Sequence, residues 1–312
     1  MSEPWLPLRG VRVVEKLVRS TDIVIEGFRP GVAKRLRIDF ESLSKINSEL
    51  IYCAISGYGQ TGPWRERPGH DVNYVAAAGG LAYPGQWLKP PARSSLPVAD
   101  MAGGSFAAIA VLSSLHQRNQ TGRGAFLDLS LFESAFFMAA MRHGLDPHVD
   151  PRAHIFPVND IFECKDGKRL TLGILEEHFW ENFRKVVPGF DGAEYSSDRE
   201  RRVNGDALSK KLSDAMKTKT SEEWIALLEA NDIPVDLCVT PAEAAVQNRQ
   251  LQERQAATEG FATFPVFADG RRGGALRAGV PKMGEHTREI LVELGFDDAE
   301  VADFFKSQTV FA

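Results

Sequence analysis

Short apolar segments alternate with helical patterns along the first half of this chain. Residues 22–26 and 50–56 are β-rich runs, and residues 31–38 between them have the spacing of a helix. A second apolar helical face, at 103–118, precedes an alternating run at 126–131. Because strands and helices that alternate in this way are typical of α/β proteins, this half of the chain predicts an α/β domain.

The pattern changes near residue 145, where several Asp-Pro and Phe-Pro pairs interrupt any long element. Beyond them, residues 161–164 and 169–174 flank an Asp-Gly pair, which predicts a β-hairpin. Capping-box patterns begin at Thr220 and Thr240. We therefore place a large α/β domain at 1–150, a smaller α+β domain at 151–250 and a separate C-terminal segment at 251–312.

Charge and cysteine content exclude several classes of protein. The net charge of −5 and the pI of about 5.9 provide no basic field for nucleic acid. Three distant cysteines, Cys53, Cys164 and Cys238, argue against a disulfide framework and fit a reducing cytoplasm. The N-terminus lacks a secretory pattern, and the longest apolar run, 106–115, falls short of the roughly 18 residues that span a bilayer. We expect a cytoplasmic protein with no membrane partner.

One motif matches a dinucleotide-binding pattern but lacks the helix that should follow it. Residues Gly57–Gly62 match G-x-G-x-x-G after a predicted strand, but prolines and charged residues follow instead of a helix. A glycine-rich active-site loop that allows close backbone approach is the better interpretation.

Three acidic or basic residues are candidates for chemistry. Asp100 lies in an apolar stretch before a predicted helix, where it is either a helix cap or a catalytic carboxylate. Apolar neighbours would raise its pKa, whereas the amides at the helix start would lower it. His70 follows Gly69 and precedes Asp71, which could orient the imidazole, although a lone histidine is more often structural. Glu176 follows a predicted strand and is otherwise read as a first-turn helix acid. No histidine group has metal-ligand spacing, so we expect no metal.

Several segments occurring in one order resemble the class III CoA-transferase family, of the CaiB/BaiF type. The family includes formyl-CoA transferase and α-methylacyl-CoA racemase, and the pattern is most similar to the racemase. The matching segments lie at 22–31, 50–63, 98–104, 121–124, 284–287 and 293–295.

The resemblance implies two alternative roles for the matched acidic and basic residues. In the racemases, residues matching Asp100 and His70 stand on opposite faces of the substrate α-carbon and exchange its proton. In the transferases, the residue matching Asp100 attacks the thioester and forms a covalent intermediate. The sequence His70–Tyr74 is similar to the racemase pattern, and Glu176 takes the position of a racemase glutamate. We therefore favour 2-methylacyl-CoA racemisation, with CoA transfer as the alternative.

The resemblance also implies a substrate and an assembly. Coenzyme A would enter as part of an acyl-CoA substrate, with no covalently bound cofactor. Its contacts would include Phe28, Arg29, Arg35 and Tyr74, whereas Gly27 replaces the usual asparagine. The expected assembly is an interlocked homodimer with a Rossmann-like large domain, to which the C-terminal segment returns.

The N-terminal region departs from the family pattern. Residues 8–14 are similar to the family's first strand, yet Glu15 runs directly into Lys16, where the family has a nucleotide-handling βαβ region. This apparent internal deletion would remove much of the CoA cradle. A third possibility is therefore a catalytically inactive binding or assembly protein.

Overall fold

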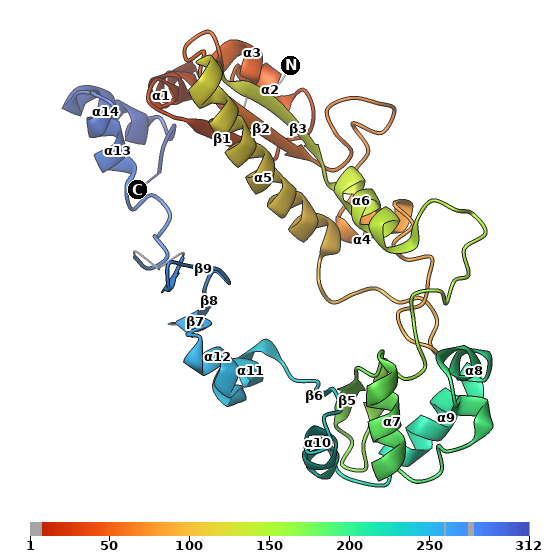
Figure 1. The fold of residues 1–312 in the computed structure, drawn as a ribbon. Helices are drawn as coiled ribbons and strands as arrows, with labels where there is room; N and C mark the ends of the chain where they lie inside the picture. The colour runs from red at the N-terminus through yellow and green to blue at the C-terminus, as the bar shows by residue number, and fades with distance from the viewer. Residues whose placement is uncertain (1–7, 259, 274–277, 312) are drawn as a thin grey trace. The chain divides into compact units, whose positions relative to one another are not determined.

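The computed structural model describes residues 8–258, 260–273 and 278–311, which form two compact units (Figure 1). The first unit contains the chain up to residue 82, residues 92–149 and the segment from 281 onward. The second contains residues 83–91 and 150–280. Each unit has its own hydrophobic core.

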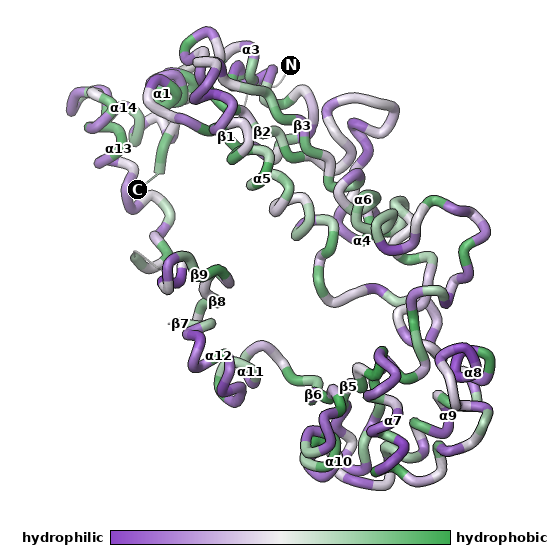
Figure 2. Tube along the Cα trace, viewed as in Figure 1, coloured by the Kyte–Doolittle hydropathy of each residue, from purple (hydrophilic) through white to green (hydrophobic). Residues whose placement is uncertain are grey.

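The first unit is built on a three-stranded parallel sheet. Strands β1 (Ile23–Glu26), β2 (Ile51–Ser56) and β3 (Ala125–Ser130) lie in the order β1-β2-β3. Apolar residues make up most of each of the three strands (Figure 2). The predicted α/β architecture is confirmed as a mixed α/β fold with a parallel sheet.

The central strand β2 is covered on both faces. Tyr52 and Ala54 pack with α1 (Leu8–Val18) and α3 (Phe40–Leu43), whereas Ile51 and Cys53 pack against α5 (Val98–Thr121). Such two-sided burial explains why β2 is nearly continuous in apolar residues instead of alternating with polar ones. The short helix α2 (Val32–Leu36) follows β1.

The expectation of a strand at residues 8–14 is wrong, because this segment begins the helix α1. Val11, Val14 and Val18 recur at intervals of three and four, which places them on one helical face. Val11 and Val18 are buried, and Val14 packs against the core beneath β2. The helix continues without a break through Glu15 and Lys16.

Two C-terminal helices complete the first unit. Helices α13 (Thr287–Glu293) and α14 (Asp298–Lys306) form a small apolar core that Val13 of α1 joins. The ammonium of Lys16 donates to the carbonyl of Leu294 at 2.8 Å. This contact satisfies a carbonyl at the end of α13 that has no partner within the helix.

Helix α5 is longer than predicted, since it starts at Val98 and extends to Thr121 before the left-handed Gly122. By length and composition it could cross a membrane, a test that core helices of soluble proteins also pass. Its buried residues pack against the sheet and against α6 (Leu131–His143). Helix α4 (Asp71–Ala77) lies beside the start of α5 and beside α6.

The second unit contains an antiparallel sheet of β4 (Ile161–Glu163), β5 (Arg169–Leu172) and β6 (Val235–Leu237). The predicted hairpin joins β4 to β5, and the predicted capping boxes start α10 and α11. The other elements of this unit are α7 (Glu177–Val186), η1 (Ala193–Tyr195), α8 (Asp198–Val203), α9 (Gly205–Met216), α10 (Ser221–Glu229), α11 (Pro241–Gln247), α12 (Arg249–Glu253), β7 (Ala257–Thr258), β8 (Phe261–Ala262), β9 (Phe267–Ala268) and β10 (Arg271–Arg272).

The close approach before β3 gives a prediction about stability. A Cβ atom at Gly124 would lie 2.0 Å from the carbonyl oxygen of Leu50, and backbone at a strand junction has little room to move. Gly124→Ala should therefore lower the free energy of unfolding by about 1–3 kcal/mol, measured by urea denaturation. Gly104→Ala is the matched control, because an alanine there meets no atom within 4 Å and should be neutral or stabilising. Equal effects of the two substitutions would contradict the prediction.

Candidate active site

A pocket of about 440 Å³ opens where the first two parallel strands end. Its walls come from the turn after β1, the end of β2 and the segment that starts α4. The carboxyl ends of parallel strands are the usual position of ligand crevices in α/β proteins. Four predicted residues, Phe28, Arg29, His70 and Tyr74, line this one pocket.

The pocket is strongly cationic. Arg29, Arg65 and Arg67 line it, and its lining contains no carboxylate. The guanidinium of Arg67 lies 4.7 Å from the ring centroid of Trp64, which orients its planar group. Arginines in this arrangement suit phosphate oxygens, because the guanidinium can donate two parallel hydrogen bonds. Sequence reasoning missed Arg65 and Arg67, although their position just after the glycine-rich loop was a usable signal.

Tyr74 is held between two glycines. A Cβ atom at Gly57 would lie 2.4 Å from the Tyr74 hydroxyl, and one at Gly69 would lie 2.7 Å from the ring. The hydroxyl donates to the Gly69 carbonyl at 2.6 Å. Burial, followed by the charges of Tyr58 and Asp100, raises the pKa of Tyr74. The glycine-rich loop thus allows close approach of a side chain. The next helix after the loop begins only at Asp71, so no helix start directly follows the glycines, as a dinucleotide-binding site would need.

An unsatisfied hydroxyl group faces the same pocket. The Ser56 side chain at the end of β2 is buried, and its hydroxyl has no hydrogen-bond partner among the described residues. Buried hydroxyls without a partner are uncommon in native structures. A ligand in the pocket could therefore satisfy the Ser56 hydroxyl.

Asp100 is the third residue of α5 and its side chain is exposed. The interpretation of Asp100 as the helix cap is wrong, because the helix begins earlier than predicted and Pro97 occupies the cap position. Partial burial, then the negative charge of Asp71, raises the pKa of Asp100, and His70 opposes the rise. The two predicted chemical groups, His70 and Asp100, therefore interact electrostatically.

His70 is the cap residue of α4, where its backbone N–H donates to Asn73 Oδ1 at 3.1 Å. Its side chain is exposed beside the pocket. The hydrogen bonds of the neighbouring Asp71 do not go to the imidazole as expected. They come from the backbone N–H groups of Ala99 and Asp100 at the start of α5.

Arg35 lines an adjacent pocket of about 450 Å³, which shares Pro30 and Arg65 with the first. Glu26 and Tyr52 form part of its wall. Burial raises the pKa of Glu26, and burial together with the Glu26 charge raises the pKa of Tyr52. All the predicted coenzyme contacts thus line two neighbouring pockets in the first unit.

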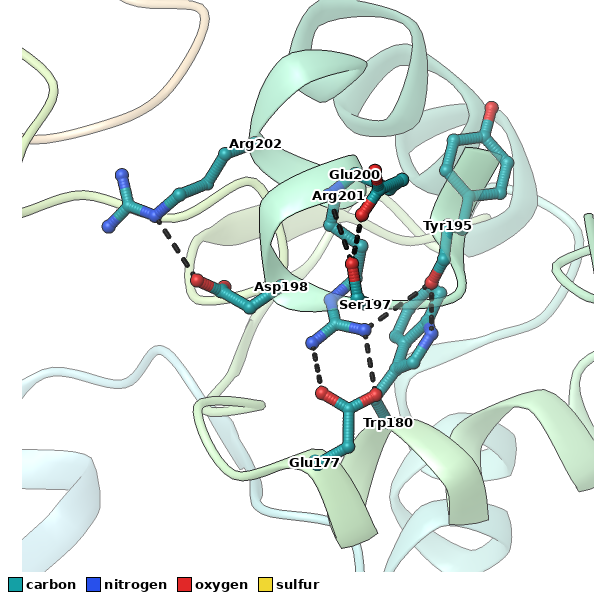
Figure 3. A network of polar contacts seen from close by, with 8 residues as sticks. All are labelled: Glu177, Trp180, Tyr195, Ser197, Asp198, Glu200, Arg201 and Arg202. Atoms are coloured by element: carbon teal, nitrogen blue, oxygen red, sulfur yellow. Dashed lines mark hydrogen bonds and ion pairs between the residues drawn. The ribbon is translucent and has the colours of Figure 1, made fainter. Parts of the chain in front are cut away.

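Glu176 belongs to the second unit, where it is the cap residue of α7. The acidic residue in the first turn of α7 is the next one, Glu177. Its carboxylate accepts hydrogen bonds from Arg201 at 3.0 and 2.7 Å (Figure 3). Arg201 is only 2% exposed and also lies 5.2 Å from the ring centroid of Trp180. This network fixes the start of α7, and a chemical role for Glu176 stays a prediction. Within the described ranges, no group of three or more histidine, cysteine or acidic side chains could hold a metal ion.

Comparison with known proteins identifies the class of enzyme. The sequence profile of CoA-transferase family III matches residues 8–287, and the chain belongs to this family of acyl-CoA enzymes. The predicted resemblance is confirmed.

Both branches of the family occur among the relatives. The chain is 30% identical to an acyl-CoA transferase of Fusarium pseudograminearum over 95% of its own length and 69% of the relative's. It is 27% identical to the α-methylacyl-CoA racemase of Mus musculus over 97% and 82% of the two chains. It is also 27% identical to the (R)-2-hydroxy-4-methylpentanoate CoA-transferase of Clostridioides difficile over 96% and 80%. Such similar identities do not separate racemase from transferase.

A solved structure matches the fold. The crystal structure of a CAIB/BAIF family protein from Brucella suis superimposes with a TM-score of 0.76 at 25% identity. The match covers 92% of this chain and 79% of that one. The mixed α/β fold is therefore that of the family.

The raised pKa of Asp100 predicts a pH-dependent cost in stability. Its ordinary value is 3.8, so folding favours the protonated form, and the cost appears as the pH rises from 3.8 through the folded pKa. Asp100→Asn should therefore increase the free energy of unfolding at pH 7, with the gain vanishing below pH 3.8. Urea denaturation at several pH values measures it.

Glu177→Gln supplies a control of opposite sign. Hydrogen bonds from Arg201 lower the pKa of Glu177 from 4.5, so its contribution to stability is present above pH 4.5 and is lost as the pH falls through the folded pKa. This substitution should reduce stability at pH 7. A loss of stability at pH 7 on Asp100→Asn would contradict the assignment.

Proposed function

We propose that this family member racemises a 2-methylacyl-CoA, with His70 and Asp100 as the acid–base pair. The observation that carries the proposal is that the hydrogen bonds from Ala99 and Asp100 to Asp71 bring the start of α4, with the pocket-lining His70, to the start of α5, where the pKa of Asp100 is raised. A carboxyl with a raised pKa retains a proton closer to neutral pH and is a better general acid than an ordinary aspartate.

The chemistry needs one base and one acid on opposite faces of the α-carbon. The thioester carbonyl acidifies the α C–H bond, and the neutral imidazole of His70 removes its proton. The carboxyl of Asp100 then returns a proton to the other face, so the configuration inverts. In the reverse direction the two residues exchange roles.

CoA transfer through Asp100 is the second candidate, supported by the transferases among the relatives. The exposed carboxylate would attack the thioester carbonyl and displace CoA to give a mixed anhydride; the CoA thiolate would then attack the Asp100 carbonyl, which gives an aspartyl-CoA thioester and releases the acyl group as a carboxylate. A second carboxylate would take up CoA by the same steps in reverse. This route requires Asp100 as a nucleophile but gives no base role to His70.

The cationic pocket supports binding of the coenzyme. In this proposal Arg29, Arg65 and Arg67 receive its phosphates, while Phe28 and Tyr74 form the apolar and aromatic wall. Arg35 contributes from the adjacent pocket. These arginines come from segments outside the N-terminal region, and they argue against the catalytically inactive alternative.

An exposed apolar surface supports the proposed interlocked homodimer. Several large side chains of α5 and α6 face solvent in the single chain: Met101, Ile109, Leu112, Phe136, Phe137 and Met141. A surface of this kind on two adjacent helices is typical of a protein interface. In this assembly the first unit would supply the Rossmann-like large domain.

The free cysteines, two of them buried, fit the proposed cytoplasmic location.

Deuterium exchange distinguishes the two reactions. In heavy water, the chain should incorporate deuterium at the α-carbon of a 2-methylacyl-CoA and racemise it, as followed by mass spectrometry and chiral chromatography. Asp100→Ala should abolish activity under either mechanism, whereas His70→Ala should reduce exchange by about 10²–10⁴-fold. Transfer of CoA to a free carboxylate without α-exchange would replace racemisation with the second candidate.

Calorimetry with free CoA tests the cationic pocket. Arg67→Ala should weaken binding by roughly 10- to 150-fold, since a hydrogen bond to a charged group contributes about 1.5–3 kcal/mol. Arg123→Ala removes an exposed arginine outside the pocket and should leave the affinity unchanged. Absence of CoA binding by the unmodified chain would instead support the inactive alternative.

A further inference from the structure

Asp71 is a buried carboxylate in α4 that accepts hydrogen bonds from the backbone of another helix, α5. It is the first residue of α4 and is only 7% exposed. Its Oδ1 atom accepts the backbone N–H of Ala99 at 2.7 Å and that of Asp100 at 3.4 Å. Two side-chain-to-backbone contacts therefore link the start of α4 to the first turn of α5.

These bonds satisfy a need that α5 does not meet itself. The first N–H groups of a helix have no partner within it, and a side chain at the cap position usually accepts one or two of them. In α5 that position is Pro97, which provides no side-chain acceptor. A carboxylate also interacts favourably with the positive end of the helix dipole.

The surroundings of Asp71 strengthen this interaction. Asp71 also lines a pocket of about 280 Å³, whose other walls are mostly apolar side chains such as Val72, Val75 and Val98 but also include the titratable residues Arg93 and His143. Because Asp71 is buried, its charge-assisted hydrogen bond is stronger than the same bond in water, and an unsatisfied carboxylate or N–H at this place would cost more free energy. The 2.7 Å bond from Ala99 and the burial of Asp71 together indicate a fixed connection between the two helices.

We propose that Asp71 is a positioning residue, which fixes the backbone of Asp100 relative to His70 by capping α5 from outside that helix. His70 is the cap of α4 and Asp71 its next residue, so one short segment carries the imidazole and also holds the backbone of the carboxylate. The inference rests on the proposed function, since positioning matters only if His70 and Asp100 act as a pair.

The charge of Asp71 has a second effect at the same place. Among the residues that the structure describes, Asp71, His70 and Tyr74 interact electrostatically with Asp100. Of these, Asp71 raises the pKa of Asp100 and His70 lowers it. Asp71 thus acts on both the position of Asp100 and its proton affinity.

Two substitutions separate the two effects. Asp71→Asn keeps an oxygen that can accept both N–H groups but removes the charge, so kcat should stay within about tenfold of the original. The pKa of Asp100 should fall, and the limb of the pH–rate profile that reports Asp100 should move to lower pH. Asp71→Ala removes the acceptor as well and should reduce kcat by about 100-fold, because small displacements of reacting groups carry penalties of this size. KM should change little in both variants.

Ser130→Ala is the matched control. The Ser130 hydroxyl caps α6 by accepting the N–H of Glu133 at 3.1 Å, and it makes no bond to α5. Its loss should lower Tm about as much as Asp71→Ala does, without changing kcat or the pH profile. An equal loss of kcat in Ser130→Ala and Asp71→Ala, or an unchanged pH profile in Asp71→Asn, would overturn the proposal.

Titration of Asp100 keeps this test independent of the reaction. With ¹³C-labelled aspartate carboxyl groups, and Asp100→Asn to assign the signal, the pKa of Asp100 should be lower in Asp71→Asn than in the original chain. If the original chain neither exchanges protons nor transfers CoA, the proposed function has failed. A pKa of Asp100 unaffected by Asp71→Asn would then separately reject the coupling between these two carboxyl groups.

Discussion

Burial of β2 on both faces is the constraint on which the first unit depends. Every peptide group of this strand lies between two layers of helix, so its neighbours must pair with it and its side chains must be apolar in both directions. Because both partner strands run parallel to it, all three strands end at the same edge. The position of the cationic pocket follows from this arrangement and not from the loops alone.

The site itself depends on close approach between backbone and side chains. Tyr74 occupies space that a Cβ atom at Gly57 or Gly69 would fill, and its hydroxyl holds the Gly69 carbonyl. The chain between these glycines can therefore fold back over the end of β2 and bring Arg67 to the pocket. The glycine-rich loop resembles a nucleotide-binding fingerprint in sequence, but its glycines accommodate an aromatic ring.

Much of the fold could be predicted from local patterns, since alternation located all three parallel strands and Asp-Gly located the hairpin in the second unit. Residues 8–14 were predicted wrongly because the prediction rested on their similarity to the family's first strand, whereas the valine spacing of three and four favours a helix. Phe28, Arg29, His70 and Tyr74 were predicted together from family motifs, and the structure places them around one pocket. The contacts of Asp71 could not be predicted, because the N–H groups that it accepts belong to a helix whose position only the fold determines.

The starts of α4 and α5 show why sequence position alone misleads about the role of acidic residues. Asp100 precedes an apolar helical pattern and has the type of a cap, yet it lies inside the helix with a raised pKa. Asp71 stands 29 residues earlier and is the group that accepts the amide of Asp100. Since Asp71 takes the stabilising position at the helix start, Asp100 is not committed to capping. The division of these tasks between two carboxylates leaves Asp100 exposed beside His70, at a cost in stability that a capping residue would not carry.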